Sequence, residues 1–255
     1  MPGAVTSPGM ERDFNRRVAL VTGAGRRVGR AIALELVGAG FDLAVHYRTS
    51  AADACEVVDI ARDMGASAFA VRADLREPSE IASMFDAIRA ECGRLDVLVN
   101  SAAVFKRTNP DKLSEADLDL HMDVNLKAPY LCSVHAARIM RASGSGKIVN
   151  VTDVAAQRPM RNFVPYCVSK AALEMMTRAM AKAFAPEVQV NAVAPGTVLF
   201  RDDETPAQRR KVISQIPRGR IGDPADIARV VRFLCDGNDH VTGTVICVDG
   251  GRSLY

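Results

Sequence analysis

The chain has 255 residues, of which 48% are hydrophobic and 25% are charged, and its formal net charge is +3. This length and composition are typical of a soluble globular protein with one large domain or two small ones. The nearly balanced charge argues against a surface devoted to nucleic acid or to acidic membranes.

The sequence carries no sign of a membrane span, a secretory leader or a metal site. No stretch approaches the ~20 apolar residues that a membrane-spanning helix needs, and residues 1–10 lack the basic start and apolar run of a signal peptide. The six cysteines and four histidines are scattered, without the spacing of a zinc site. We therefore expect a cytoplasmic protein with free thiols and no bound metal.

Short runs rich in β-branched residues alternate along the chain with longer segments of helical periodicity. The expected strands are 18–22, 42–47, 68–72, 97–100, 148–152, 188–193 and 245–248. The expected helices are 27–39, 51–64, 79–92, 115–141, 162–185 and 224–235. This alternation predicts a single-domain α/β fold over residues 15–255, Rossmann-like and doubly wound, with a seven-stranded parallel sheet and helices on both faces. Residues 1–14 are expected to form a flexible N-terminal tail.

Residues 197–220 interrupt the alternation with a polar, charged segment. It is too long for a simple connection, and long insertions in compact domains are often lids or binding loops, so we predict a substrate loop here. Its basic run, Arg209-Arg-Lys211, is compatible with an anion site. Charge runs usually face water, however, and we expect a solvated helix face.

A glycine-rich turn, Thr22-Gly-Ala-Gly-Arg-Arg-Val-Gly29, follows the first expected strand and opens the first expected helix. Glycines let the backbone approach a pyrophosphate, which then sits on the N-terminus of the helix. The cofactor contacts expected in this turn are Gly23, Gly25, Arg26, Arg27, Val28 and Gly29.

The end of the second expected strand indicates which dinucleotide is bound. An NAD site places an acidic residue about 20 residues after the glycines, where it accepts from the ribose hydroxyls. Here the chain reads His46-Tyr-Arg-Thr-Ser50, without an acid. Arg48, helped by Arg27, suits the 2′-phosphate of NADPH instead. The neighbours expected to contribute are Tyr47, Thr49 and Ser50. The alternative is that these are ordinary polar residues of a loop.

Tyr166 and Lys170 lie four residues apart at the start of a long apolar segment. In a helix this spacing places a phenol and an ammonium on one face. The ammonium favours the phenolate, so we expect it to lower the pKa of Tyr166 from about 10 and to make the phenol a usable acid or base. A chance pair on a surface helix is the alternative.

Taken in order, these features resemble the short-chain dehydrogenase/reductase family over residues 17–251. The further matches are Ala73-Asp-Leu75, Asn100-Ser-Ala-Ala103, Asn125, Pro195-Gly196 and Val248-Asp-Gly-Gly251. The resemblance implies a hydride-transferring oxidoreductase, usually a homotetramer, in which Asp74 meets the adenine and Asn125 supports a water. It also implies that Lys170 holds the nicotinamide ribose and tunes Tyr166, the proton donor. The remaining cofactor contacts it implies are Leu75, Asn100, Ser101, Ala102, Pro195, Gly196, Thr197 and Val198.

Three positions depart from the common pattern of that family. Arg27 replaces the middle glycine of the turn, Ser101-Ala-Ala103 replaces Asn-Ala-Gly, and Asp153 stands thirteen residues before Tyr166, where the family generally has a serine. A serine hydroxyl polarises a substrate carbonyl, whereas an ionised aspartate only accepts hydrogen bonds and repels a carbonyl oxygen. Asp153 therefore favours a substrate with N–H donors or, if protonated, delivers a proton to a ring nitrogen. The alternative is that Asp153 merely orients a water.

The same departures resemble the pteridine reductases and bacterial dihydromonapterin reductases of the family. Those enzymes have an aromatic residue shortly after the fourth strand, which Phe105 matches, and Val198-Leu-Phe200 also looks like that subgroup. The resemblance implies that Phe105 stacks on a flat pterin, with Asp153, Tyr166 and Phe200 as further substrate contacts. The alternative for Phe105 is a loop aromatic packed in the core.

We therefore expect an NADPH-dependent oxidoreductase that reduces a C=N bond of a pterin, with no nucleic-acid partner. Two alternatives stay open. One is reduction of a ketone, such as a 3-oxoacyl thioester or a sugar carbonyl, for which Tyr166, Lys170 and Asn125 are all in place. The other is a catalytically idle NADP-binding sensor.

Overall fold

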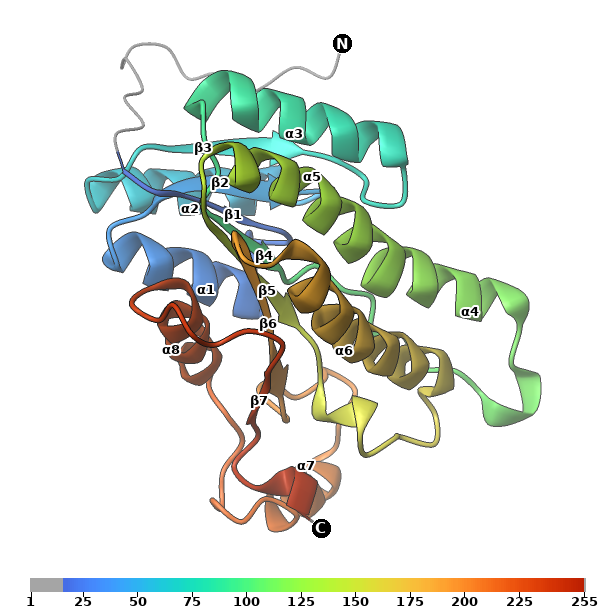
Figure 1. Cartoon of the computed structure of the whole chain (residues 1–255). Coiled ribbons are helices and arrows are strands. Elements are labelled where there is room, and N and C mark those ends of the chain that lie inside the picture. The colour runs from blue at the N-terminus through green and yellow to red at the C-terminus, as the bar shows by residue number, and fades with distance from the viewer. Residues whose placement is uncertain (1–15, 255) are drawn as a thin grey trace.

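Seven parallel strands cross the part of the protein that the computed structural model describes, residues 16–254 (Figure 1). They are β1 (Val18–Val21), β2 (Asp42–Tyr47), β3 (Ala68–Arg72), β4 (Val97–Asn100), β5 (Gly146–Val151), β6 (Val188–Pro195) and β7 (Val245–Val248). Their order in the sheet is β3-β2-β1-β4-β5-β6-β7, and every neighbouring pair is parallel. The predicted seven-stranded parallel sheet is confirmed. The tail predicted over residues 1–14 lies outside the described residues.

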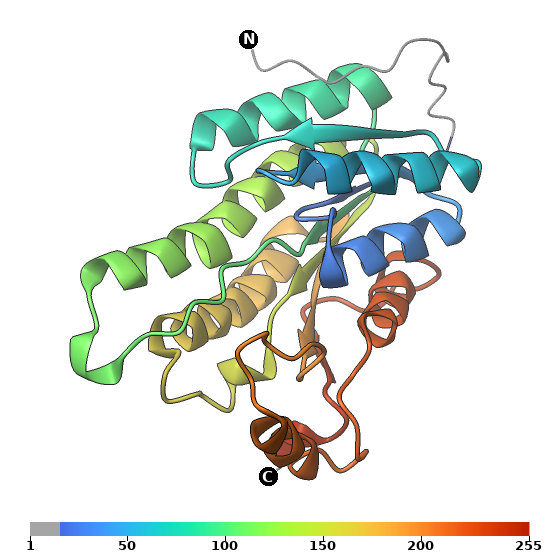
Figure 2. The same ribbon diagram turned by 180° about the vertical axis from the view of Figure 1, so that it is seen from behind.

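Helices cover both faces of the sheet, as Figure 2 shows from behind. One face carries α1 (Arg27–Gly38), α2 (Ala51–Asp63) and α8 (Pro224–Cys235), and the other carries α3 (Pro78–Cys92), α5 (Ala128–Ala142) and α6 (Val164–Phe184). The short elements are α4 (Glu115–Met122), α7 (Pro206–Ser214), η1 (Pro110–Lys112), η2 (Asp123–Lys127), η3 (Val154–Ala156) and η4 (Arg252–Leu254). Because helices pack on both sides, every side chain of β1 and β4 is buried, which explains their continuous apolar runs.

The long helix predicted over 115–141 is interrupted, and there the prediction is wrong. Between α4 and α5 the chain makes the π-helical turn η2, in which the N–H of Ala128 reaches back to the carbonyl of Asp123. Pro129 explains the interruption, because it has no N–H to donate and its ring clashes with the carbonyl four residues earlier. That carbonyl belongs to Asn125, which therefore cannot receive the usual helical hydrogen bond from residue 129. The other predicted helices and strands differ from the structure by at most two residues at either end.

The 197–220 segment contains one helix, α7, which begins with a capping box between Thr205 and Gln208. No residue of α7 is buried. Arg210 and Lys211 are exposed, as predicted for a solvated face, whereas the guanidinium carbon of Arg209 lies 5.1 Å from the ring centroid of Phe200. In both views α7 lies beside the C-terminal residues of the chain (Figures 1 and 2).

Candidate active site

The carboxyl ends of the strands border a cavity of about 660 Å³ where the strand order reverses. Its lining includes residues that follow β1, β2, β3, β4, β5 and β6. At such a reversal, neighbouring strands send their connections to opposite faces of the sheet, and the crevice between the connections is the usual ligand site of this architecture. The strand topology thus places the predicted glycine turn and the Tyr166/Lys170 pair on one cavity.

Backbone lines one end of the cavity, at the start of α1. Gly23 has a φ of +66°, and a Cβ atom at Gly29 would lie 2.3 Å from the carbonyl oxygen of Gly23, so both positions require glycine. The N-cap residue Arg26 makes no side-chain capping hydrogen bond, and the first turn of α1 has no acidic residue. The N–H groups of this turn are therefore free to bind an anion such as a phosphate.

Two arginines give this end of the cavity positive charge. Arg27 has a φ of +54°, the left-handed conformation that a glycine adopts without strain, which agrees with its place in the turn. Neighbouring Arg26 is engaged by Asp53, at 2.7 Å. Within residues 16–254, neither Arg27 nor Arg48 pairs with an acidic side chain, although both line the cavity. Both guanidinium groups are thus available to a negatively charged ligand.

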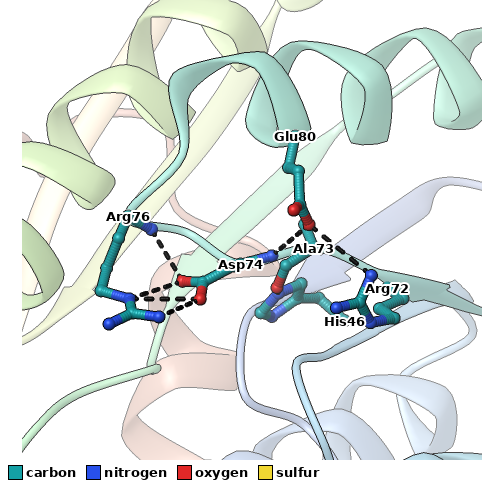
Figure 3. Close-up of polar contacts among 6 residues, drawn as sticks. All are labelled: His46, Arg72, Ala73, Asp74, Arg76 and Glu80. Carbon is teal, nitrogen blue, oxygen red and sulfur yellow. Dashed lines mark hydrogen bonds and ion pairs between the residues drawn. The ribbon is translucent and has the colours of Figure 1, made fainter. Parts of the chain in front are cut away.

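Asp74, after β3, is held as an ionised carboxylate (Figure 3). Arg76 donates from Nε to Oδ1 at 3.0 Å and from Nη2 to Oδ2 at 2.5 Å, and the Asp74 N–H donates to Glu80 Oε2 at 2.7 Å. The hydrogen bonds from Arg76 lower the pKa of Asp74 to about 2. Asp74 therefore presents a permanent acceptor to the cavity.

His46 joins three strand ends beneath the cavity. Its Nδ1 accepts from the Gly23 N–H at 3.0 Å, so its Nε2 carries the proton and donates to the Ala73 carbonyl at 3.0 Å. Burial lowers the pKa of His46 to about 4, so the ring is neutral near pH 7. Figure 3 shows the ring beside Ala73. Sequence reasoning assigned His46 no role, because only the pairing of β1, β2 and β3 brings these groups together.

Tyr166 and Asp153 form a hydrogen-bonded pair at the other end of the cavity. The phenol donates to Asp153 Oδ2 at 2.7 Å, while Asp153 Oδ1 accepts from the Ala155 N–H at 2.8 Å at the start of η3. Burial raises the pKa of Asp153, and burial together with the nearby Asp153 carboxylate raises the pKa of Tyr166 well above 10. The side chain thirteen residues upstream is therefore the direct partner of the phenol.

Lys170 does not lower the pKa of Tyr166, and this corrects the expectation from the sequence. Its Nζ donates to the Val151 carbonyl at 2.8 Å and lies 5.7 Å from the centroid of the Tyr166 ring. Burial lowers the pKa of Lys170 itself to about 8. The loss of hydration and the carboxylate of Asp153 both raise the pKa of the phenol, which is the direction opposite to the one expected from the ammonium.

Asn125 is buried within η2, and its side chain holds neighbouring segments of the site together. Its Oδ1 accepts from the Val104 N–H at 2.8 Å, and its Nδ2 donates to the Val104 carbonyl at 3.0 Å and to Ser169 Oγ at 3.0 Å. These bonds fix the segment after β4 to α6, one residue before Lys170. The side chain is thus engaged in positioning, and Pro129 denies the backbone carbonyl of Asn125 its usual helical donor.

Phe105 forms an exposed aromatic wall. Its ring stacks on Phe163 with a centroid separation of 4.5 Å and an interplanar angle of 6°, and it meets the Tyr166 ring edge-on at 4.7 Å. The side chain is 46% exposed, so the alternative of an aromatic buried in the core does not hold. A second cavity of about 220 Å³ adjoins Phe105, Asp153 and Tyr166 and extends to the 197–204 segment.

Most of the predicted contact residues line the larger cavity, and some do not. Those that line it are Gly23, Arg26, Arg27, Val28, Gly29, Arg48, Asp74, Leu75, Ser101, Ala102, Phe105, Asp153, Tyr166, Lys170, Pro195, Gly196 and Val198. Thr197 lines only the smaller one. Those outside both linings are Gly25, Tyr47, Thr49, Ser50, Asn100, Asn125 and Phe200.

Two of these outliers have a clear physical explanation. Asn100 is buried, and its amide donates to Asn150 Oδ1 at 2.8 Å, so it ties β4 to β5. Phe200 packs against Arg209 instead of facing the cavities.

Several further lining residues were not predicted individually as contacts, although some belong to the motifs of the family resemblance or to the predicted 197–220 loop. They are His46, Ala73, Ala103, Val104, Val124, Val151, Thr152, Leu199, Arg201 and Asp202. Most of them adjoin predicted site residues in the chain, so the carboxyl-end rule for parallel strands was the available signal.

Comparison with known proteins agrees with this geometry. The family profile described as "Enoyl-(Acyl carrier protein) reductase" matches residues 23–253. An NADPH-dependent aldehyde reductase-like protein of Arabidopsis thaliana chloroplasts is 36% identical, over 92% of this chain and 93% of its own length. The 3-oxoacyl-[acyl-carrier-protein] reductase FabG of Staphylococcus aureus is 34% identical, over 92% of this chain and 98% of its own. A crystal structure described as a short-chain alcohol dehydrogenase, from Sinorhizobium meliloti, superposes with a TM-score of 0.90 at 33% identity, covering 96% of this chain and all of that one.

A dinucleotide-type crevice with a tyrosine and a lysine at one end defines an NAD(P)-dependent oxidoreductase. The chain belongs to the short-chain dehydrogenase/reductase family. Within residues 16–254, no helix combines the length and apolarity that a membrane crossing requires, and no cluster of three potential metal ligands is present. Cys55, Cys132, Cys167, Cys235 and Cys247 are free thiols, of which Cys247 is exposed.

Proposed function

We propose that the protein is an NADPH-dependent reductase of a C=N bond in a flat nitrogen heterocycle of the pterin class. The observation that carries the proposal is the 2.7 Å hydrogen bond between Tyr166 and Asp153, an acid at the position where the family generally has a serine. A carboxyl group there complements the N–H donors and ring nitrogens along the edge of a pterin, which a simple ketone lacks.

The larger cavity fits NADPH. The closely approached glycines Gly23 and Gly29 and the uncapped start of α1 would hold the pyrophosphate. Arg27 and Arg48, which lack acidic partners within the described residues, would hold the 2′-phosphate. The ionised Asp74 would accept from the adenine amine. The bound cofactor supplies the hydride.

Tyr166 and Asp153 supply the proton. Both pKa values are raised by burial, so this pair retains protons to higher pH than exposed groups would. With Asp153 protonated, the pair holds two protons and no net charge. When it then gives one proton to a ring nitrogen, a single negative charge stays behind, shared across the hydrogen bond that the remaining proton makes between the two oxygens. The buried ammonium of Lys170 offsets that charge. Lys170 therefore stabilises the Tyr166–Asp153 pair after the proton has been transferred.

Phe105 supplies the platform for the ring. One face of Phe105 is covered by Phe163, and the side chain is still 46% exposed. A planar heterocycle stacked on the free face gains about 1 kcal/mol beyond the burial of its area. The edge-on contact with Tyr166 directs the phenol toward the rim of such a ring.

Reduction of a carbonyl compound is the second candidate, and the names of the relatives favour it. The similar Arabidopsis and Staphylococcus proteins are named for aldehyde and 3-oxoacyl substrates. Tyr166, Lys170 and Asn125 are compatible with such a reaction, whereas the carboxyl group of Asp153 opposes a carbonyl oxygen. A catalytically idle NADP-binding sensor is less well supported, because the complete Tyr166–Asp153–Lys170 group would have no use in it.

The proposal is tested by following NADPH consumption with dihydrobiopterin, dihydromonapterin, dihydrofolate and an acetoacetyl thioester. We expect turnover of at least one pterin in preference to the thioester, and a loss of about 10²–10⁴ in rate for Tyr166→Phe. Turnover of the thioester alone favours the carbonyl candidate. Binding of NADPH without consumption of it in any reaction favours the sensor.

We also propose that the protein is a cytoplasmic homotetramer with a small-molecule substrate. Tyr130 on α5 and Val168 and Met175 on α6 are 49%, 48% and 61% exposed, which leaves apolar side chains for a second copy to cover. Light scattering after size-exclusion chromatography measures the assembly, and a monomer at micromolar concentration would contradict it.

A further inference from the structure

The smaller cavity, of about 220 Å³, has charged side chains of both signs in its lining. Its four charged residues are Asp153, Arg201, Glu204 and Arg252, and its apolar wall includes Phe105 and Val198. A cavity beside the Tyr166–Asp153 pair is where substituents of the substrate ring would lie. The pairing of these four charges therefore bears on which substituents the site accepts.

Arg201 is shared between two neighbouring carboxylates. Arg201 lies 3.6 Å from Glu204 Oε1, and its Nε donates to Asp203 at 2.8 Å. Glu204 Oε2 is buried and has no hydrogen-bond partner within the described residues. The charge of Arg201 is thus taken up by neighbouring carboxylates, and Arg252 is the cationic lining residue without one in the described part of the chain.

Arg252 has no acidic partner within residues 16–254. Its Nη1 donates to the hydroxyl of Thr197, another lining residue, and its positive charge opposes the rise in the pKa of Asp153. The guanidinium therefore lies in the same cavity as the Tyr166–Asp153 pair. A guanidinium has five N–H donors, so a single hydroxyl leaves most of them free.

The backbone around Arg252 is firmly held, so the guanidinium is not on a free chain end. Asp249 accepts from the Gly251 N–H at 2.9 Å and from the Ser253 N–H at 2.6 Å, on either side of Arg252. The carbonyl of Arg252 itself accepts from Arg158 Nη1 at 2.5 Å. The same turn lies against α7 and its flanks in both views (Figures 1 and 2), where the Arg218 N–H donates to Gly250.

We propose that Arg252 is a substrate-binding residue that selects a substrate with an anionic substituent, a carboxylate or a phosphate, in the cavity that it lines together with Asp153. The cavity would then bind two groups of one substrate: Asp153 would accept from its N–H donors, and Arg252 would bind its negatively charged substituent. A planar guanidinium binds carboxylate and phosphate through two parallel hydrogen bonds, which matches this assignment. The inference rests on the proposed function for the pterin ring of the substrate. The preference for an anionic substituent does not depend on that function.

Binding to the complex of the enzyme with NADP+ tests the charge preference without turnover. The probes are folate, which has a carboxylate-bearing tail, and biopterin, which has an uncharged one, with Kd measured by fluorescence. We expect Arg252→Leu to weaken folate binding about tenfold or more and to change biopterin binding less than twofold. Arg252→Lys keeps the charge but loses the paired donors, so its Kd for folate should lie between those of the wild type and Arg252→Leu.

Arg161→Leu is the matched control, because it removes the same charge from an exposed arginine of the loop before α6 that lines neither cavity. It should leave both Kd values unchanged. Unchanged Kd of NADPH shows that each variant is folded. If Arg252 acted only by holding Asp153 ionised, Arg252→Leu would shift both probes alike, and that result would overturn the proposal.

Failure of the pterin assignment is separable from failure of this inference. If the wild-type complex binds neither heterocycle, the proposed pterin substrate is wrong, and the pair acetoacetate and ethyl acetoacetate then tests the charge preference on a carbonyl compound. The inference is overturned if the wild type prefers the anionic member of neither pair, or if Arg252→Leu keeps that preference.

Discussion

Replacing His46 by asparagine tests whether the buried neutral ring beneath the crevice makes the fold acid-sensitive. Burial lowers the pKa of His46 from 6.5 to about 4, so between these values the unfolded chain binds a proton that the folded protein does not. Stability contributed by the neutral ring is thus complete above pH 6.5 and is lost as the pH falls toward 4. The linkage amounts to about 2 kcal/mol between pH 7 and pH 4.5, and to about 3 kcal/mol in full.

The assay is equilibrium urea unfolding of the wild type and the variant at several pH values from 7 to 4.5. An asparagine oxygen can replace Nδ1 as the acceptor of the Gly23 N–H but cannot reach the Ala73 carbonyl, so the variant should be less stable at pH 7 by about 1–2 kcal/mol. At pH 4.5 the difference should move by about 2 kcal/mol in favour of the variant, so that it vanishes or reverses, because the variant lacks the titrating group. His240→Asn, at an exposed position, should leave the pH dependence unchanged. Parallel pH curves for the wild type and His46→Asn would refute the reasoning.

Three further substitutions test the cofactor and substrate walls. Arg48→Ala should reduce kcat/KM with NADPH about tenfold or more and leave that with NADH unchanged; equal losses would contradict a 2′-phosphate contact. Arg27→Gly should weaken NADPH binding severalfold in titrations while leaving thermal stability unchanged or raising it by up to about 1 kcal/mol, since glycine adopts a φ of +54° without strain. A clear drop in Tm would argue against relief of strain there. Phe105→Ala should raise KM for a dihydropterin about three- to tenfold with the Kd of NADPH unaltered. An unaltered KM would contradict stacking of the substrate on Phe105.

The sequence was sufficient to predict the features that depend on local patterns. Alternating buried strands and amphipathic helices predicted the parallel sheet, and the family resemblance assigned the glycine turn and Tyr166 to one cofactor site. The family resemblance singled out Asp153, thirteen residues before Tyr166, and the structure joins the two side chains. These features are short-range or follow from the topology of a parallel sheet.

Features that depend on tertiary contacts could not be predicted in the same way. Residue spacing suggested that Lys170 lowers the pKa of Tyr166, but burial and the Asp153 carboxylate decide its direction, and both are known only from packing. His46 acquires its role from two other strands, and Arg252 from a C-terminal turn that reaches the 197–220 segment. The π-helical turn at Asn125 had a local signal in Pro129, which helical periodicity alone did not register.

The most direct test of the proposed chemistry is the ratio of kcat/KM for dihydrobiopterin to kcat/KM for an acetoacetyl thioester, measured with NADPH for the wild type and for Asp153→Ser. If the carboxyl group of Asp153 selects a C=N substrate, the wild type prefers the pterin, and the serine variant loses at least tenfold of that preference by losing pterin turnover, by gaining carbonyl turnover, or by both. Asp153→Asn keeps the size of the side chain and should also impair pterin reduction, because it cannot share a proton with Tyr166. An unchanged ratio in Asp153→Ser would contradict the assignment of this protein as a reductase of C=N bonds.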